Sequence, residues 1–288
     1  MASLKETKGR ITSVKSTQKI TSAMRMVASA KFHRTQQLSQ NFQIYVDEFK
    51  KTVDALGGIQ DENTVDISKN GCVLLIPVSS GSGLCGSYNS GILKETIFIA
   101  DYHTSNGTDV KFMPIGKKVA HDLKNVGKEC ILDFNLIAED VGKDGAVNRC
   151  GELVESIQKK IKSQEITAVE FIYHHFISMG RQVITREYVD FSEPKIKREK
   201  SNEQMFLTEP SPCELIAEVH PKMLNSKVYG ILLDSVTSEH ASRMLAMQTA
   251  DDNAKDLLQD LTLLYNKSRQ QAITNELIDI MGGKSSES

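Results

Sequence analysis

Residues 231–281 read ILLDSVTSEHASRMLAMQTADDNAKDLLQDLTLLYNKSRQQAITNELIDIM, without a single glycine or proline. The stretch from Arg10 to Leu56, near the other end of the chain, also lacks both residues. Glycine and proline are the residues that most often interrupt helices, so each stretch is predicted to be one unbroken helix. At about 1.5 Å per residue the two helices would be roughly 77 Å and 70 Å long. Because a compact domain cannot contain them, we expect them to project and to cover their apolar stripes on each other or on a partner.

Both predicted helices carry apolar residues at the spacing of a coiled coil. On the first helix the stripe has one slip and comprises Leu38, Phe42, Tyr45, Phe49, Val53 and Leu56. On the second helix it comprises Ala250, Ala254, Leu257, Leu261 and Leu264. Residues 1–40 carry eight Lys or Arg and one acid, whereas residues 250–288 carry seven acids and four bases. The two helices have opposite net charge, and one leaves the central domain while the other returns from it. They are therefore predicted to form an antiparallel pair.

The middle of the chain changes its period and alternates predicted strands with predicted helices. The strands are 72–78, 110–115, 129–133, 168–176 and 182–191, and the helices are 89–102, 117–125 and 146–163. This order predicts an α/β fold, in which a three-layer domain with a mainly parallel sheet joins the long antiparallel coiled coil of the terminal helices. The predicted organisation is an N-terminal shaft helix (1–57), a Rossmann-like α/β domain (70–192), an exposed connection (193–212) and a C-terminal shaft helix (213–288).

A glycine motif follows the first predicted strand, where Gly81-Ser82-Gly83-Leu84-Cys85-Gly86 matches the GxGxxG pattern of dinucleotide-binding loops. The second half of that fingerprint is missing, because the next strand is followed by Lys117 and Lys118 rather than by an acid for the ribose. A tight turn that requires glycine explains the motif more simply. An NAD(P)-dependent oxidoreductase using this loop remains an alternative, as does a coiled-coil adaptor for acidic proteins or nucleic acid.

Composition argues against several other classes of protein. The chain has no tryptophan and few aromatic residues, which weakens any proposal of base stacking on nucleic acid. Its five cysteines form no CxxC pair, and its histidines have no metal-ligand spacing, so no metal or cofactor is expected. The sequence opens directly into charged residues without an apolar segment, which predicts a cytoplasmic or membrane-peripheral protein.

Three blocks of the sequence resemble the γ subunit of F-type ATP synthases, and they extend from end to end. The first contains Arg10-Ile11, Thr17-Gln18-Lys19-Ile20-Thr21 and Met26-Val27-Ala28, and the second is Gly83-Leu84-Cys85-Gly86-Ser87-Tyr88-Asn89. The third contains Ser238-Glu239-His240-Ala241, Arg243-Met244, Tyr265-Asn266, Arg269-Gln270, Ile273-Thr274 and Glu276-Leu277. The resemblance implies a central-stalk rotor that couples ion flow through the membrane rotor to ATP synthesis. The subunit would not be catalytic.

The resemblance also implies partners, a location and interface residues. The partners would be the α and β subunits, the ε subunit and the membrane c-ring, with no nucleic acid and no direct small-molecule substrate. The location would be the cytoplasmic face of a bacterial inner membrane. Interface or coupling roles are carried over to Lys19, Met24, Arg25, Gly83, Leu84, Cys85, Gly86, Arg243, Gln270, Thr274 and Glu276. Gly81 and Ser82 stand where the family usually has an acid and then a basic residue before its Gly-Leu-Cys-Gly.

Overall fold

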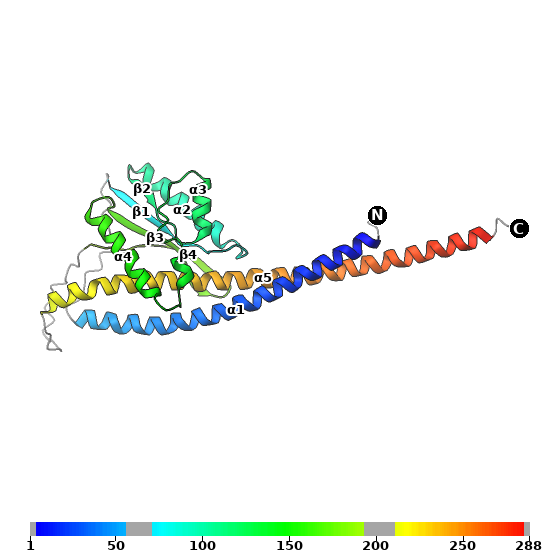
Figure 1. The fold of residues 1–288 in the computed structure, drawn as a ribbon, viewed down its shortest axis with the longest axis horizontal. Coiled ribbons are helices and arrows are strands. Elements are labelled where there is room, and N and C mark those ends of the chain that lie inside the picture. The colour runs from blue at the N-terminus through cyan, green and yellow to red at the C-terminus, as the bar shows by residue number, and fades with distance from the viewer. Residues whose placement is uncertain (1–3, 56–70, 193–210, 285–288) are drawn as a thin grey trace. The chain divides into compact units, whose positions relative to one another are not determined.

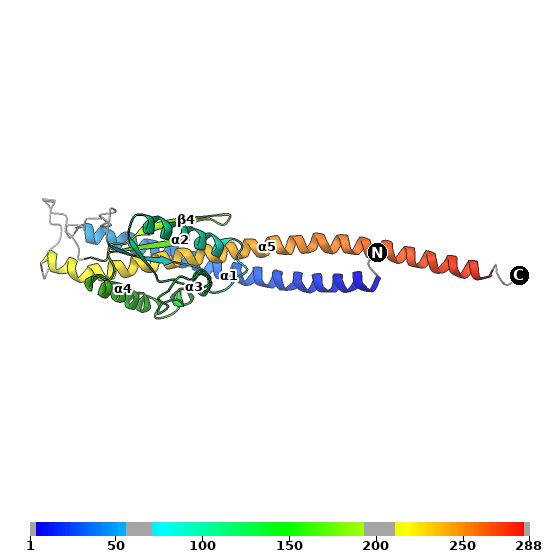
Figure 2. The ribbon, with the colours of Figure 1, turned by 90° about the horizontal axis from the view of Figure 1, so that it is seen from above.

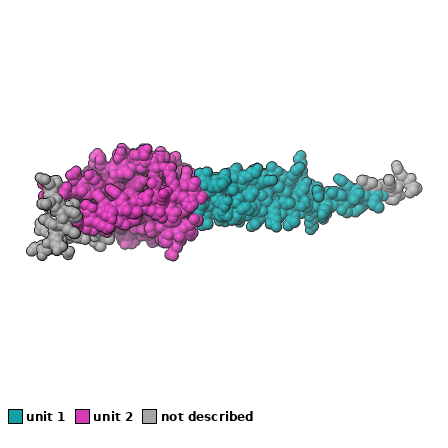
Figure 3. Space-filling model, turned by 90° about the horizontal axis from the view of Figure 1, so that it is seen from below, with its two compact units in different colours: residues 1–28, 244–288 teal, residues 29–243 magenta. Residues whose placement is uncertain are grey.

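The computed structural model describes residues 4–55, 71–192 and 211–284. Two helices contain most of the residues outside the central domain: α1 (Leu4–Ala55) and α5 (Pro212–Lys284), with 52 and 73 residues respectively (Figure 1). Both long helices expected from the missing glycines and prolines are therefore confirmed. Residues 193–210 of the predicted connection 193–212 lie outside the described residues, and α5 already begins at Pro212. Contacts divide the chain into unit 1, residues 1–28 with 244–288, and unit 2, residues 29–243 (Figure 3).

Unit 2 contains a four-stranded sheet in the order β2-β1-β3-β4. Strand β1 (Cys72–Pro77) pairs in parallel with β2 (Asp109–Phe112) and with β3 (Ala168–Ser178), while β4 (Arg181–Tyr188) pairs antiparallel with β3. The prediction of a mainly parallel sheet closed by an antiparallel pair is confirmed.

One predicted strand is wrong. Residues 129–133 make only an isolated bridge, in which Cys130 pairs with Phe112 and the amide of Ile131 donates to the Phe112 carbonyl at 2.8 Å. The chain then turns into a short 3-10 helix, Ile137–Asp140, that the sequence pattern did not reveal. A single bridge leaves the apolar residues near 130 packed on the rim of the sheet rather than paired along it.

Helices cover both faces of the sheet and make the three layers that were predicted (Figure 1). Helices α2 (Tyr88–Ser105) and α3 (Lys117–Asn125) pack on the face that carries Val73 and Leu75. Helix α4 (Ala146–Lys162) and α5 pack on the face that carries Leu74 and Ile76. Alternate residues of a strand point to opposite faces, so a strand buried on both sides is apolar throughout, as β1 is.

The terminal helices are antiparallel in each unit. In unit 1 residues 4–28 lie beside the part of α5 after residue 244, running in the opposite direction (Figure 2), and Arg25 donates a hydrogen bond to Gln248. In unit 2 the rings of Phe42 and Tyr229 meet edge to face at 5.0 Å between centroids. Gly230 allows this approach, because a Cβ there would lie 3.3 Å from the Phe42 ring. The predicted antiparallel pairing is confirmed.

The covered stripe of α5 in unit 1 differs from the predicted one. Leu257 and Leu264 are 47% and 48% exposed, so they lie outside the stripe. The covered positions, separated by alternating steps of four and three, are Met247, Asp251, Ala254, Leu258, Leu261 and Tyr265. Asp251 occupies one of the covered positions. A prediction that follows apolar residues alone passes over it and places Leu257 and Leu264 in the stripe instead. On α1 the predicted Tyr45 is likewise 51% exposed, and Leu56 lies outside the described residues.

None of the helices, as far as the structure describes them, combines the length and the apolar character needed to cross a membrane. The same described ranges contain no group of three or more His, Cys, Asp or Glu side chains placed to hold a metal ion.

Candidate functional site

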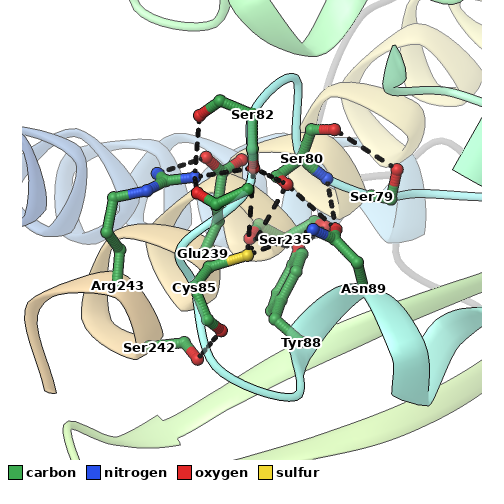
Figure 4. Close-up of polar contacts among 11 residues, drawn as sticks. Ser79, Ser80, Ser82, Cys85, Tyr88, Asn89, Ser235, Glu239, Ser242 and Arg243 are labelled. Carbon is green, nitrogen blue, oxygen red and sulfur yellow. Dashed lines mark hydrogen bonds and ion pairs between the residues drawn. The ribbon is translucent and has the colours of Figure 1, made fainter. Parts of the chain in front are cut away.

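The glycine loop, residues 81–86, joins β1 to α2 and lies against α5 within unit 2 (Figure 4). Leu84 has a backbone φ of 63° and Gly86 a φ of 61°, so the chain makes two left-handed turns in three residues. Glycine adopts this conformation freely, whereas leucine is strained in it. The loop therefore holds one large apolar side chain, 64% exposed, in a conformation that the surrounding contacts must maintain.

Those contacts come from α5. The Arg243 guanidinium donates to the carbonyl of Ser82 at 3.1 Å and to that of Gly83 at 3.4 Å, and the Ser242 hydroxyl donates to the Cys85 carbonyl at 2.8 Å (Figure 4). Just after the loop, the Tyr88 hydroxyl donates to the Ser235 carbonyl at 2.9 Å. Helix α5 thus binds the loop and the start of α2 at several points over two turns of helix.

A buried ion pair supports the central contact. Arg243 Nη1 lies 2.6 Å from Glu239 Oε1, one helical turn earlier, and the two residues are only 9% and 8% exposed. Burial raises the pKa of the Glu239 carboxyl, while the charge and hydrogen bond of Arg243 oppose that rise. Removing either partner would leave the other charge buried and uncompensated, which is far costlier than losing a surface pair.

The loop is also fixed from within. The Asn89 side-chain oxygen accepts hydrogen bonds from the Ser80 amide and hydroxyl at 3.1 and 2.9 Å, and its amide nitrogen donates to the Cys85 sulfur at 3.1 Å. Cys85 is 1% exposed, so it packs and accepts a hydrogen bond beneath the loop. The predicted group Gly83, Leu84, Cys85 and Gly86 is thus brought together with the predicted Arg243.

This geometry disfavours the dinucleotide alternative. A phosphate-binding loop presents backbone amides to its ligand at the start of a helix. Here the carbonyls of Ser82, Gly83 and Cys85 are bound by α5, and Tyr88, the first residue of α2, is buried against the same helix. Lys117, which stands where a dinucleotide-binding protein would have an acid for the ribose, lies 2.9 Å from Glu139 and pairs with it. The loop joins the sheet to the long helix, which is a mechanical role.

The remaining predicted residues lie in unit 1, apart from the loop group. Lys19 is exposed, Met24 is half-buried, and the half-buried Arg25 donates to Gln248. Near the end of α5 the exposed residues are Gln270, Thr274 and Glu276; the Thr274 hydroxyl donates to the Gln270 carbonyl at 2.9 Å. Their predicted contacts with other subunits stay predictions.

The hydrogen bonds and the ion pair that hold the glycine loop and the start of α2 on α5 are called the anchor below. Sequence reasoning assigned no role to four of its residues: Tyr88, Ser235, Glu239 and Ser242. The spacing of Glu239 and Arg243, four residues apart on a helix, is a signal for an ion pair. Nothing in the local pattern shows that this pair is buried or that its partner is the loop, because those contacts join residues about 160 positions apart.

Together, the fold and the loop contacts define a class of protein. It has an α/β domain on a long antiparallel helix pair, and the glycine loop binds the domain to α5 through hydrogen bonds. Residues 3–286 match the family model described as ATP synthase. The ATP synthase gamma chain of Parabacteroides distasonis is 42% identical over 287 residues, with 98% of each chain covered. That of Phocaeicola vulgatus is 41% identical over 290 residues, covering 98% of this chain and 99% of the other. The chain belongs to the ATP synthase gamma chain family.

Solved structures agree at the level of the fold. A chain of the Euglena gracilis mitochondrial ATP synthase (OSCP/F1/c-ring) superimposes with a TM-score of 0.66 at 17% identity, covering 98% of this chain and 94% of that one. A chain from the central stalk and c-ring of the Tetrahymena thermophila mitochondrial ATP synthase gives a TM-score of 0.56 at 22% identity, with 80% and 99% covered.

Proposed function

We propose that this chain is the rotating central-stalk subunit of an F-type ATP synthase and couples ion flow through a membrane rotor to ATP synthesis. The family match over residues 3–286, from one terminal helix to the other, is the observation that carries the proposal. A shaft needs both long helices, and a truncated match to the α/β domain alone would not support this function.

The subunit itself is proposed to be non-catalytic and to need no cofactor. The glycine loop, which is the one motif that suggested a nucleotide, uses three carbonyls to bind α5. The proposed partners are the α and β subunits around the shaft, the ε subunit and the membrane c-ring. The proposed location is peripheral, on the cytoplasmic face of a bacterial inner membrane.

The interface residues are proposed from their exposure. Leu84 presents a large apolar side chain to solvent on a strained loop, as expected of a contact with another subunit. On α1, Lys19 lies among the exposed apolar residues Ile20, Met26 and Val27. Near the end of α5, Gln270, Thr274 and Glu276 alternate with Ile273 and Leu277, which are 48% and 56% exposed.

Co-purification tests the proposal. A tag is placed after Ser288, ATP synthesis by membrane vesicles is measured to establish that the tag is tolerated, and the solubilised complex is recovered on the tag. We expect α, β and ε subunits and the c-ring in near-constant proportion, absent from an untagged strain carried through the same steps. Recovery of the chain without α and β subunits, or micromolar binding of NADH by the purified chain, would contradict the proposal.

A further inference from the structure

A second feature of unit 2 is a half-open cavity of about 510 Å³ next to the glycine loop. Helix α1, the loop, the start of α3, residues 138–143 and α5 all contribute to its walls. Cavities that hold small ligands have volumes of about 300–1,000 Å³, so this one is large enough for such a ligand. The anchor described above explains the loop but does not explain an open space beside it.

The walls of the cavity are strongly basic. Its charged lining consists of two acids, Glu139 and Glu239, and five bases: Lys31, Arg34, Lys117, Lys143 and Arg243. The whole chain has a formal net charge of −2, so this positive charge is a local concentration. Glu139 is matched by Lys117 at 2.9 Å and Glu239 by Arg243 at 2.6 Å, while Lys143 lies 3.2 Å from Asp140, an acid that also pairs with Arg149. Lys31 and Arg34, which pair with no acid among the described residues, carry the excess positive charge.

The three bases other than Lys117 and Arg243 come from two parts of the chain. Lys143 is 64% exposed at its side chain and lies 3.2 Å from Asp140, and Arg34 donates to the backbone carbonyl of Gly142 at 3.0 Å. Lys31 projects from α1, and its charge acts on both Glu239 and His240. Positive groups from α1 and from residues 138–143 therefore converge on one space from different sides.

His240 adds a polar group to the wall. Its Nδ1 atom is buried and has no hydrogen-bond partner among the described residues, although the ring lines the cavity. A buried ring nitrogen without a partner costs free energy. Burial, followed by the charges of Arg243 and Lys31, lowers the pKa of His240 to about 4. A negative ligand would oppose the effect of those two charges.

We propose that this cavity binds a compact oxyanion of the phosphate type, with two or more negative charges, held by Lys31 and Arg34 from α1 and by Lys143, next to the ring of His240. Phosphate oxygens suit this arrangement because several acceptors in a small volume meet donors from several directions. An acidic segment of another chain would instead spread its charges along a surface. The proposal goes beyond the rotor function and does not depend on it.

Calorimetry on the purified full chain at low ionic strength tests the proposal, with inorganic pyrophosphate as the probe. We expect saturable binding by the wild type, and Lys31→Gln or Arg34→Gln should each weaken it by about tenfold, as expected for one charge-assisted hydrogen bond. Lys51→Gln is the matched control, because Lys51 lies on the same helix outside the cavity and pairs with Glu48. Its affinity should equal that of the wild type.

Two further measurements make the outcome decisive. Inorganic phosphate and ADP, titrated separately, distinguish a free phosphate from the phosphates of a nucleotide as the source, and either result supports the site. The pKa of His240, followed by NMR, should rise when pyrophosphate binds, and in Lys31→Gln the rise should need about tenfold more pyrophosphate. The proposal is overturned if pyrophosphate fails to bind at millimolar concentration, or if the cavity and control variants bind it equally. Binding of an acidic peptide in its place would also overturn it and would assign the cavity to a partner chain.

Discussion

Helix α5 can be compared with itself, because its part in unit 2 and its part in unit 1 have different surroundings. In unit 2 almost every turn carries a side chain at or near zero exposure, among them Val228, Leu232 and Leu233. In unit 1 the buried residues of α5 are Met247, Asp251 and Ala254, and leucines of this helix such as Leu263 remain more than half exposed. One uninterrupted helix is therefore a core element over its first part and half of a thin two-helix seam over its second.

The two parts also differ in what pairs across them. In unit 2 the helix buries apolar side chains and one ion pair, Glu239 with Arg243, against the loop. In unit 1 the seam includes Arg25 with Gln248 and the buried Asp251, whose second oxygen has no hydrogen-bond partner among the described residues. A seam with polar members and exposed leucines gains little stability from its own packing. The first part thus packs within this chain, and the proposed rotor function predicts that other subunits cover the second part.

The largest expected effect comes from comparing the two arginines. Arg243→Met should lower the free energy of unfolding by about 3–5 kcal/mol, because Glu239 would stay buried without its partner. Arg25→Met removes a hydrogen bond between half-buried groups and should cost about 1 kcal/mol or less. Urea unfolding of the isolated full chain measures both. The double variant Arg243→Met with Glu239→Leu should recover much of the loss; equal effects of the two single variants would show that the anchor is no more buried than the seam.

The next effect compares two leucines of α5. Leu232 is fully buried, so Leu232→Ala should lower the free energy of unfolding by about 2–5 kcal/mol. Leu257 is 47% exposed, and Leu257→Ala should change it by about 0.5 kcal/mol or less. Thermal and urea unfolding of the two variants provide the measurement. A loss at Leu257 as large as that at Leu232 would mean that the seam is packed as densely as the core.

A pH-dependent effect belongs to unit 2 alone. The pKa of His240 is lowered from 6.5 to about 4, mainly by burial and further by Arg243 and Lys31. At pH 5 the unfolded chain therefore binds a proton that the folded chain does not, so stability falls as pH falls from 8 to 5, by about 2 kcal/mol from this group. His240→Gln should remove that share of the slope. The pKa values of His174 and His220 are also lowered by burial and act in both proteins, so only the difference between the two slopes tests His240.

The last comparison concerns the glycine loop, where the expected change in stability is small. Leu84→Gly relieves the left-handed strain but adds backbone freedom to the unfolded chain, so the free energy of unfolding should change by about 1 kcal/mol or less. ATP synthesis by membrane vesicles should nevertheless fall, because an exposed apolar contact is lost. Leu84→Met, which keeps a large apolar side chain at this position, is the control. Full activity in Leu84→Gly would remove this side chain from the proposed interface.

The sequence predicted what depends on local pattern. Missing glycine and proline marked both long helices, and the apolar run of β1 marked a strand buried on both faces. The strand expected at 129–133 failed because its neighbours decide whether an apolar run pairs along the sheet, and only Cys130 does so. The stripe through Leu257 and Leu264 failed because Asp251 occupies a covered position.

The candidate site was predicted only in part, for a similar reason. Its members Gly83, Cys85 and Arg243 came from resemblance, while the bonds that unite them join distant parts of the chain. Local spacing can suggest the pair Glu239 and Arg243, but burial and the carbonyl partners depend on how α5 crosses the sheet. The basic residues of the cavity beside the glycine loop likewise come from several elements of the chain.

If the parts of α1 and α5 in unit 1 turn as a shaft within other subunits, as proposed, a covalent link to one of those subunits should stop the turning. In a background with the five native cysteines replaced by alanine and shown to be active, Ile20→Cys is labelled with a benzophenone maleimide; Ile20 is 60% exposed on α1. Illumination of the assembled complex should join the chain to an α or β subunit, and ATP hydrolysis should fall in proportion to the cross-linked fraction. Hydrolysis that continues at full rate when nearly every chain is linked would show that this part of the chain does not turn within the other subunits.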